Sequence, residues 1–213
     1  MNVKNVLAIG AHYDDVDLGC GGTLAKLRKE CGAKVYKLTL TDNVTRFKEM
    51  NICVDAESSI DCSKKACSIL GIEEICTFKP LECNHLDYSS DIMQLIERII
   101  FEKKIDTVFM HYKDDINKDH IAAYQLCITA ARYCKNILMY YSNGYLPADQ
   151  FSPTVFVDIS DYVCLKEKAL SQYDGNHNRF NSLFETVLNR NKVHGYACQV
   201  KSAEGFVPIK MTI

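Results

Sequence analysis

Short apolar runs alternate with longer segments of helical periodicity along most of the chain, and this alternation limits the possible folds more than any other feature. Residues 6–9 form a continuous apolar run, which is typical of a strand buried on both faces. After Gly21-Gly22, apolar residues recur at helical spacing. The same pattern predicts further strands at 35–40, 75–78 and 107–110, and helices at 63–70, 92–101 and 121–133. Such alternation predicts an α/β fold with a mainly parallel sheet.

The pattern is less regular after Pro153. It predicts a strand at 155–157, a helix at 165–173 and a last strand at 197–200. No linker, repeat or low-complexity stretch divides the chain. A chain of 213 residues, 47% of them hydrophobic, is long enough for one sizeable core, so we expect a single domain over residues 1–213.

Charge and cysteine usage narrow the class of partner and the compartment. The 25 Lys and Arg nearly balance the 27 Asp and Glu, without a run of like charge, which argues against nucleic acid and anionic membranes. The N-terminal apolar run is too short for a signal peptide, and no stretch approaches the roughly 20 apolar residues of a membrane span. The 11 cysteines are odd in number and scattered without a Cys-x-x-Cys pair, which favours reduced thiols. We expect a cytoplasmic protein with a small-molecule substrate, and leave open whether it forms a homo-oligomer.

Ionisable side chains follow two of the predicted strands. His12-Tyr13-Asp14-Asp15 comes after the strand at 6–9, and Asp119-His120 opens the helix that follows the strand at 107–110. Parallel strands end at one edge of a sheet, so these side chains are expected to converge there. Two imidazoles and a carboxylate are a ligand set suited to zinc. Of the two adjacent aspartates, one can bind the ion while the other accepts a proton from water.

Other motifs favour plainer interpretations. Gly19-Cys20-Gly21-Gly22 lacks the Gly-x-Gly-x-x-Gly spacing of a dinucleotide loop and follows two aspartates that would repel a phosphate. It is expected instead to let the helix pack close to the metal loop. Cys20 is expected to be a small core residue rather than a nucleophile. His111 is either a residue that supports the site or a packed histidine, His85 is expected in an ordinary loop, and His194 at the surface.

The two ionisable segments also resemble the motifs of a known family. His12-Tyr13-Asp14-Asp15, with Gly19-Cys20-Gly21-Gly22-Thr23 after it, closely resembles the His-Pro-Asp-Asp motif and the glycine-rich segment of the LmbE-like, or GlcNAc-phosphatidylinositol de-N-acetylase (PIG-L), family. The segment 115–120 resembles the second motif, which ends in a metal-binding histidine. Further similarity continues almost to the C-terminus, at Asp158-Ile159, Lys166, Gln172, His177-Asn178-Arg179 and Ala203-Glu204-Gly205-Phe206.

The resemblance implies a Rossmann-like three-layer α/β fold and a zinc-dependent N-deacetylase. It implies that His12, Asp15 and His120 bind zinc, or another divalent metal, and that Asp14 is the general base. The expected substrate is an N-acetylglucosamine-type amino sugar or its conjugate, with His177 and Arg179 as substrate-binding candidates. The identity of the sugar and of the group attached to it stays open.

The chain departs from the family pattern at several positions. Tyr13 replaces the usual proline, and Asn117 replaces a histidine that assists the oxyanion or leaving group in many members. An amide can still donate a hydrogen bond but cannot transfer a proton, so Asn117 is expected to support the reaction and Asp14 to act as both base and acid. Many members carry an arginine just before the helix that corresponds to 63–70, and this chain has none there. Arg46 is therefore a substitute candidate for binding substrate.

Two other functional classes are compatible with the same fold. A sugar-binding or regulatory protein that has lost catalysis is one, because fold alone does not determine function. The retention of His12, Asp14, Asp15 and His120 argues against it. A cysteine hydrolase is the other, and it would need a thiol paired with a histidine that the metal does not use.

Overall fold

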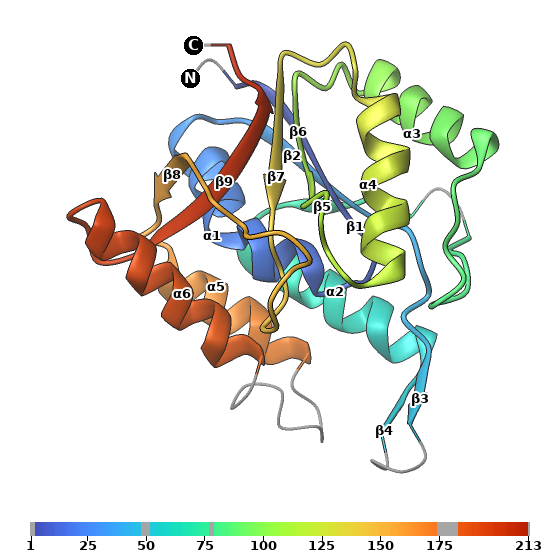
Figure 1. Ribbon diagram of the computed structural model, residues 1–213, viewed down its shortest axis with the longest axis horizontal. Helices are drawn as coiled ribbons and strands as arrows, with labels where there is room; N and C mark the ends of the chain where they lie inside the picture. Colours follow the sequence, from blue (N-terminus) through green and yellow to red (C-terminus); the bar gives the residue numbers. More distant parts are fainter. Residues whose placement is uncertain (1–2, 48–51, 77–78, 174–182, 213) are drawn as a thin grey trace.

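The computed structural model describes residues 3–47, 52–76, 79–173 and 183–212. A seven-stranded sheet has the strand order β5-β2-β1-β6-β7-β9-β8 (Figure 1). The first five strands in this order are parallel, whereas β9 runs antiparallel to both of its neighbours. Their bounds are β1 Asn5–Gly10, β2 Lys34–Thr39, β5 Glu73–Glu74, β6 Thr107–His111, β7 Asn136–Tyr140, β8 Val155–Asp158 and β9 Ala203–Lys210.

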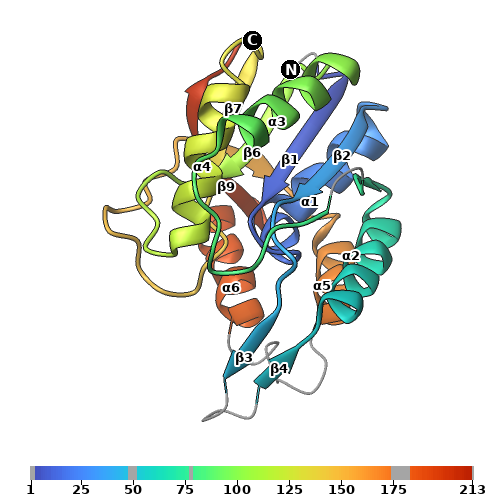
Figure 2. The same ribbon diagram turned by 90° about the vertical axis from the view of Figure 1, so that its right-hand side faces the viewer.

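Helices cover both faces of this sheet, so the fold has the three layers that the sequence predicts. Figure 2 shows α3 and α4 on one side of the sheet and α2 and α5 on the other. The helices are α1 Asp15–Glu30, α2 Ala56–Leu70, α3 Ser90–Glu102, α4 Lys118–Ala130, α5 Val163–Leu170 and α6 Leu183–Ala197, with a 3-10 turn at Ser171–Tyr173. Within the described residues, no helix is both long and apolar enough to cross a bilayer.

The side chains of β1 contribute to two separate cores, one on each face of the sheet. This explains why apolar and polar residues do not alternate along the strand. Leu7 and Ile9 pack in the core beneath α3 and α4, whereas Val6 and Ala8 pack in the core beneath α1, α2 and α5. Successive side chains of a strand point to opposite faces, so a strand covered on both sides must be apolar throughout. All four side chains are fully buried.

Local signals set the ends of α2. At its start, the Asp55 carboxylate accepts a hydrogen bond from the Ser58 N–H at 2.8 Å. At its end, Gly71 adopts a left-handed conformation with φ 73° and donates its N–H to the last turn. Glycine enters this region without the steric penalty of a side chain, which is why the sequence signals the end of the helix there.

Several predicted elements differ from the structure. The strand predicted at 75–78 is displaced: β5 is Glu73–Glu74, residues 75–76 are not in a strand, and residues 77–78 lie outside the described part. The strand predicted at 197–200 is wrong, because α6 ends at Ala197 and a turn follows before β9. The helix predicted at 121–133 is α4, which begins and ends three residues earlier. Elements outside the predicted set are β7, β9, α6 and the hairpin of β3 Thr45–Phe47 with β4 Ile52–Val54.

The cysteines conform to the expectation of reduced thiols where the structure describes them. Every cysteine with a described side chain is free, and Cys20 and Cys67 are buried core residues. Burial raises the pKa of the Cys20 thiol well above its usual value, which opposes a role as a nucleophile.

Candidate metal centre

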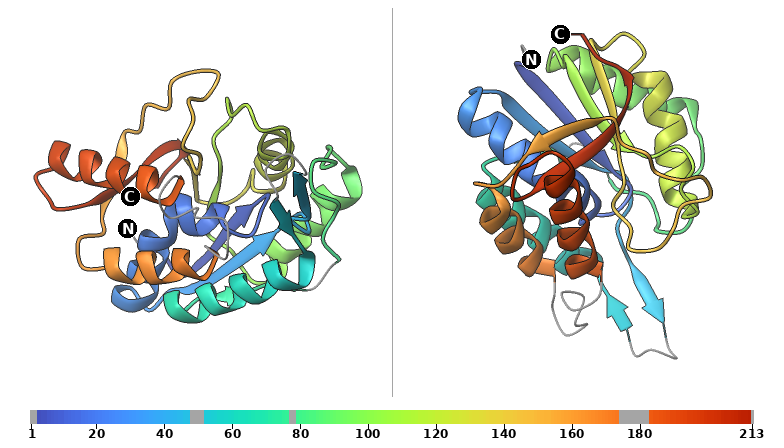
Figure 3. Two further views of the ribbon diagram at one scale, coloured as in Figure 1. Left: turned by 90° about the horizontal axis from the view of Figure 1, so that it is seen from below. Right: turned by 60° about the vertical axis from the view of Figure 1, so that its left-hand side comes forward.

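The two ionisable segments meet at one edge of the sheet. Neighbouring parallel strands β1 and β6 end at Gly10 and His111, and their following loops lead into α1 and α4. The left view in Figure 3 looks at the molecule from below, towards the edge where the parallel strands end. His12 lies in the loop before α1, Asp15 is the first residue of α1, and His120 lies in the first turn of α4.

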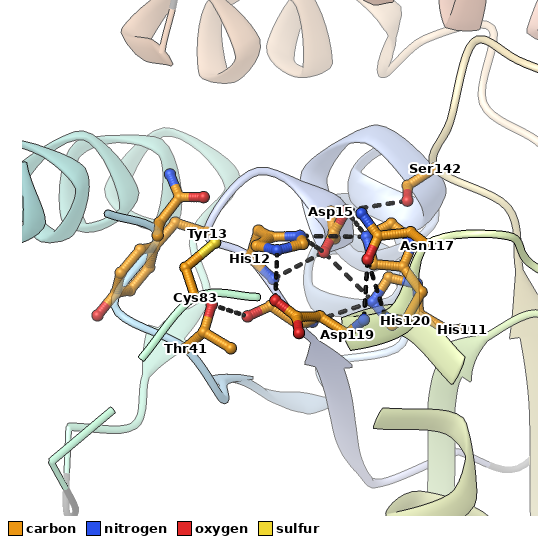
Figure 4. Close-up of polar contacts among 12 residues, drawn as sticks. His12, Tyr13, Asp15, Thr41, Cys83, His111, Asn117, Asp119, His120 and Ser142 are labelled. Carbon is orange, nitrogen blue, oxygen red and sulfur yellow. Dashed lines mark hydrogen bonds and ion pairs between the residues drawn. The ribbon is translucent and has the colours of Figure 1, made fainter. Parts of the chain in front are cut away.

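Three side chains present potential ligand atoms to a common point (Figure 4). His12 Nδ1 lies 3.1 Å from His120 Nε2 and 3.2 Å from Asp15 Oδ2, and His120 Nε2 lies 3.2 Å from Asp15 Oδ1. Tetrahedral zinc with bonds of about 2.0–2.1 Å holds its ligand atoms roughly 3.3 Å apart. The spacing of the three groups therefore fits a single zinc-sized ion.

Two further carboxylates orient the imidazoles. His12 Nε2 lies 3.2 Å from Asp119 Oδ2, and His120 Nδ1 lies 2.9 Å from Asp115 Oδ2. We assign a proton to each of these nitrogens, because only an N–H can donate to a carboxylate. The opposite nitrogen of each ring then carries a lone pair, and both lone pairs face Asp15. Three acceptors this close together repel one another unless a cation or protons lie between them.

The pKa values of His12 and His120 also indicate that the cluster favours positive charge at its centre. Burial lowers the pKa of His12, but hydrogen bonds with Asp119 and Asp15 outweigh burial and raise it well above the usual value. Burial also opposes a charge on His120, yet Asp15 and Asp115 raise its pKa. The cluster thus favours positive charge at its centre, where a metal ion and protons compete for the same lone pairs.

The loop after β7 supports the centre, and sequence analysis did not identify it. Ser142 Oγ donates to Asp15 Oδ1 at 2.9 Å, and Asn143 Nδ2 donates to Asp115 Oδ2 at 2.9 Å. Arg190 of α6 holds this loop through two backbone carbonyls, one of which is Asn143 O at 2.8 Å. These contacts hold the Asp15 and Asp115 carboxylates in place, and Asp115 in turn orients the His120 ring.

His111 packs against the centre, and its Nε2 lies 3.3 Å from Asp15 Oδ2. Its ring stacks on His120 with 4.0 Å between centroids, and its Nε2 accepts the Ala11 N–H at 3.0 Å. Burial, together with the neighbouring charge of His120, lowers the pKa of His111 to about 4. The neutral ring therefore anchors the loop after β1.

The two catalytic candidates lie at helix starts. Asp14 is the N-cap residue of α1 and is 3% exposed. A carboxylate at this position is stabilised by the helix dipole. Asn117 is the N-cap residue of α4, where its Oδ1 accepts hydrogen bonds from the N–H groups of Asp119 and His120. Its capping role occupies the amide oxygen, so the Nδ2 is the remaining hydrogen-bonding group of the amide.

The substrate-binding candidates are less well defined. Arg46 lies in β3, at the edge of the sheet where β2 ends, and its side chain is outside the described part. His177 and Arg179 both lie outside the described residues. His85 has a side chain that is 68% exposed, in agreement with an ordinary loop histidine. His194, expected at the surface, is instead partly buried in α6 beside Phe156 and Gly205.

A buried lysine holds the loop in which tyrosine replaces the family's proline. Lys37 Nζ donates to the Tyr13 carbonyl at 2.6 Å and to Asp17 Oδ2 at 2.9 Å. The Tyr173 hydroxyl also lies 2.9 Å from the same carbonyl. The loop conformation is therefore held by side-chain hydrogen bonds to its backbone.

Comparison with known proteins connects these loops to a family. The family model of PIG-L, GlcNAc-PI de-N-acetylase, matches residues 7–131, which contain both loops of the metal centre. A curated relative is the uncharacterized deacetylase YaiS of Escherichia coli (strain K12). It is 28% identical over 176 residues, which cover 80% of this chain and 90% of that protein.

Solved structures share the fold at lower identity. N,N'-diacetylchitobiose deacetylase from Pyrococcus horikoshii is 22% identical with a TM-score of 0.79, covering 97% of this chain and 84% of that one. The 4-carboxy-2-hydroxymuconate hydratase GalB from Pseudomonas putida KT2440 is 17% identical with the same TM-score of 0.79, covering 99% and 98%. One fold thus carries both a hydrolase and a hydratase, so the fold alone does not identify the reaction.

Proposed function

The chain belongs to the PIG-L family of GlcNAc-PI de-N-acetylases, and from this premise we propose that it is a metal-dependent N-deacetylase. Its reaction is the hydrolysis of the N-acetyl group of an N-acetylglucosamine-type amino sugar or conjugate, which yields acetate and a free amine. The observation that carries this proposal is the convergence of His12 Nδ1, His120 Nε2 and the Asp15 carboxylate at 3.1–3.2 Å.

The proposed ion is zinc, held by His12, Asp15 and His120, with another divalent metal as an alternative. When bound, zinc lowers the pKa of a coordinated water towards neutrality and polarises an amide carbonyl. The tautomers that Asp119 and Asp115 impose keep the two imidazole lone pairs available to the ion.

Asp14 acts as the general base in this proposal. It neighbours the ligand Asp15 at the start of α1, and a carboxylate there can accept a proton from the attacking water. It removes a proton from the attacking water and returns a proton to the leaving amine, because Asn117 cannot transfer one. Water and the amide are thereby converted into acetate and the amine without another proton carrier.

Asn117 contributes a hydrogen bond rather than a proton. Its Oδ1 is engaged in capping α4, which orients the amide plane. The Nδ2 then donates to the oxygen on which negative charge develops during attack. We propose this role because Asn117 stands where many family members have a histidine, and an amide can donate a hydrogen bond but cannot transfer a proton.

We assign substrate binding to Arg46, His177 and Arg179. Arg46 lies in the β3–β4 hairpin, which projects from the lower part of the molecule in Figure 1. His177 and Arg179 belong to the segment that resembles the family sequence. An acetamido sugar is the substrate class favoured by the family and by the similarity to N,N'-diacetylchitobiose deacetylase.

Acetate release from a panel of acetamido sugars tests the proposal. The panel contains N-acetylglucosamine, N,N'-diacetylchitobiose and nucleotide-linked and lipid-linked N-acetylglucosamine, each measured with native, chelated and zinc-restored protein. We expect equal amounts of acetate and amine from at least one sugar, loss of activity on chelation and recovery with zinc. Sugar binding without acetate release from any member would instead support the regulatory alternative.

A further inference from the structure

A second set of potential ligands lies at the other edge of the His12 ring. His12, Cys83 and Asp119 each offer one ligand atom, and these three atoms lie within 4.8 Å of one another. Figure 4 shows Cys83 on the side of the His12 ring away from His120. The set therefore shares His12 with the candidate metal centre but faces the opposite direction.

Two members of this set already have the spacing of ligands. His12 Nε2 lies 3.2 Å from Asp119 Oδ2, close to the roughly 3.3 Å expected around tetrahedral zinc. A zinc-bound thiolate and imidazole lie about 3.5 Å apart, because the zinc–sulfur bond is longer. The sulfur of Cys83 is within 4.8 Å, so it needs to approach by about 1.3 Å at most.

The loop that carries Cys83 is built against the metal centre. Its start is joined to the sheet by the bridge between Leu81 and Thr41. The N–H groups of Asn84 and Leu86 donate to the Asp119 carboxylate at 2.7 and 3.2 Å. Asn84 adopts a positive φ of 66°, a conformation that asparagine tolerates better than most residues. Cys83 itself is only 6% exposed, and its sulfur also lies 4.0 Å from Thr45 Oγ1.

We propose that His12 Nε2, Cys83 Sγ and the Asp119 carboxylate form a second, weaker site for a thiophilic divalent cation such as Zn²⁺ or Cd²⁺. Thiolate and imidazole ligands select such ions over Mg²⁺ or Ca²⁺. Occupation of both sites makes the His12 imidazolate a bridge between two ions. Binding releases two protons to solvent, one from the Cys83 thiol and one from His12 Nε2, and this requirement weakens the site relative to the first.

Occupation of this site changes the groups that support the first one. Asp119 would then bind the second ion instead of accepting the His12 N–H. Inhibition by excess zinc follows as a consequence, and that consequence rests on the proposed deacetylase function. The binding of a second ion does not rest on it, so the two proposals can fail separately.

Titration of the metal-free protein with Co²⁺ tests the site directly, because thiolate bound to cobalt produces an intense near-ultraviolet charge-transfer band. We expect the first equivalent to bind without this band and a second, weaker equivalent to produce it. No band at any equivalent, or a band that accompanies the first equivalent, would overturn the proposal.

Matched cysteine variants assign the band to one thiol. Cys83→Ala, with Cys83→Ser as a variant of more similar size, should bind one equivalent and show no band. Cys134→Ala is the control, because Cys134 is equally buried but lies just before β7, at the opposite edge of the sheet. It should bind two equivalents. A band that persists in the folded Cys83 variants would contradict the assignment.

Discussion

Two carboxylates outside the proposed ligand set, Asp115 and Asp119, determine which nitrogen of each imidazole faces the centre. Each occupies one nitrogen of a histidine ring, at 2.9 Å for His120 and 3.2 Å for His12. Ligand histidines without such partners can rotate or change tautomer, which weakens metal binding. The geometry of the centre is thus a property of five side chains rather than three.

At the residue scale, Asp14 and Asp15 are expected to differ in a measurable way. Asp14→Asn should retain the metal and lower the rate of acetate release by about a hundredfold to ten-thousandfold, the loss expected for general acid–base catalysis. Asp15→Asn should instead weaken metal binding, because it removes a ligand charge. Metal content and rate are measured for both variants. Loss of metal from Asp14→Asn alone would exchange the two roles.

Asn117 has two roles that substitutions can separate. Asn117→Ser retains an oxygen that can cap α4 but removes the amide N–H, whereas Asn117→Ala removes both. We expect both variants to lose about a hundredfold in kcat, as for removal of an oxyanion donor. Only the alanine variant should lose about 1 kcal/mol of stability in urea unfolding. Full activity of the alanine variant would rule out the amide as a donor, because alanine, unlike serine, has no side-chain donor.

The residues closest to the proposed ion were predictable, and those that support them were not. His12, Asp15 and His120 lie in short continuous motifs directly after buried strands, so local pattern and family resemblance both mark them. Ser142 and Asn143 act only through contacts with distant residues, and nothing in their local sequence signals this. The sequence likewise does not predict a metal-binding role for Cys83, because a single cysteine in a loop forms no recognisable motif.

At the scale of elements, α1 carries a glycine whose role depends on close packing. A Cβ built on Gly19 would lie 2.1 Å from Cδ2 of Tyr140, whereas a Cβ on Gly21 would have no neighbour closer than 3.6 Å. Tyr140 cannot move away freely, since its hydroxyl donates to the Ile9 carbonyl at 2.7 Å. The absence of a side chain at Gly19 therefore allows α1 to lie directly on the sheet.

The two glycines provide a matched pair of substitutions. Gly19→Ala should destabilise the protein by about 1–3 kcal/mol or more through overpacking against Tyr140. Gly21→Ala should be neutral or stabilise by up to about 1 kcal/mol, because alanine favours the helix. Urea unfolding of both variants measures the difference. Equal stability would show that α1 can shift away from β7.

The errors in predicted elements have two physical origins, a buried charged residue at β5 and a small core beneath α6. Glu73 and Glu74 form the strand that apolar periodicity places two residues later, because the Glu74 carboxylate points into a buried cluster with Ser63 and Thr39. A charged residue that is buried by its partners looks like a surface residue in the sequence. Likewise, α6 covers only a small core around Leu18 and Leu170, so its apolar pattern is weak.

At the scale of the whole molecule, the C-terminal residues complete a structure that begins at the N-terminus. Strand β9 lies between β7 and β8, and Phe206 packs in the same core as Val6 and Ala8. The buried Lys166 donates to Glu204 at 2.6 Å and to the Leu18 carbonyl in α1 at 2.7 Å. We infer that the chain folds as one unit, although the family model matches only residues 7–131.

Truncation tests this inference. A chain that ends at residue 150 lacks β8, β9, α5 and α6 and leaves an edge of the sheet and part of one core uncovered. We expect it to fail to fold, and the full chain to unfold in one transition that coincides by circular dichroism and tyrosine fluorescence. A stable, cooperatively unfolding fragment would show two separate domains.

The metal content of the purified chain tests the account most directly, with His85→Ala as the control for His120→Ala. We expect about one divalent ion per chain in the wild type and in His85→Ala, because His85 is exposed in a loop. His120→Ala should lose most of the ion, since the ring opposite Asp115 is removed. Stoichiometric metal in His120→Ala would contradict the proposed centre.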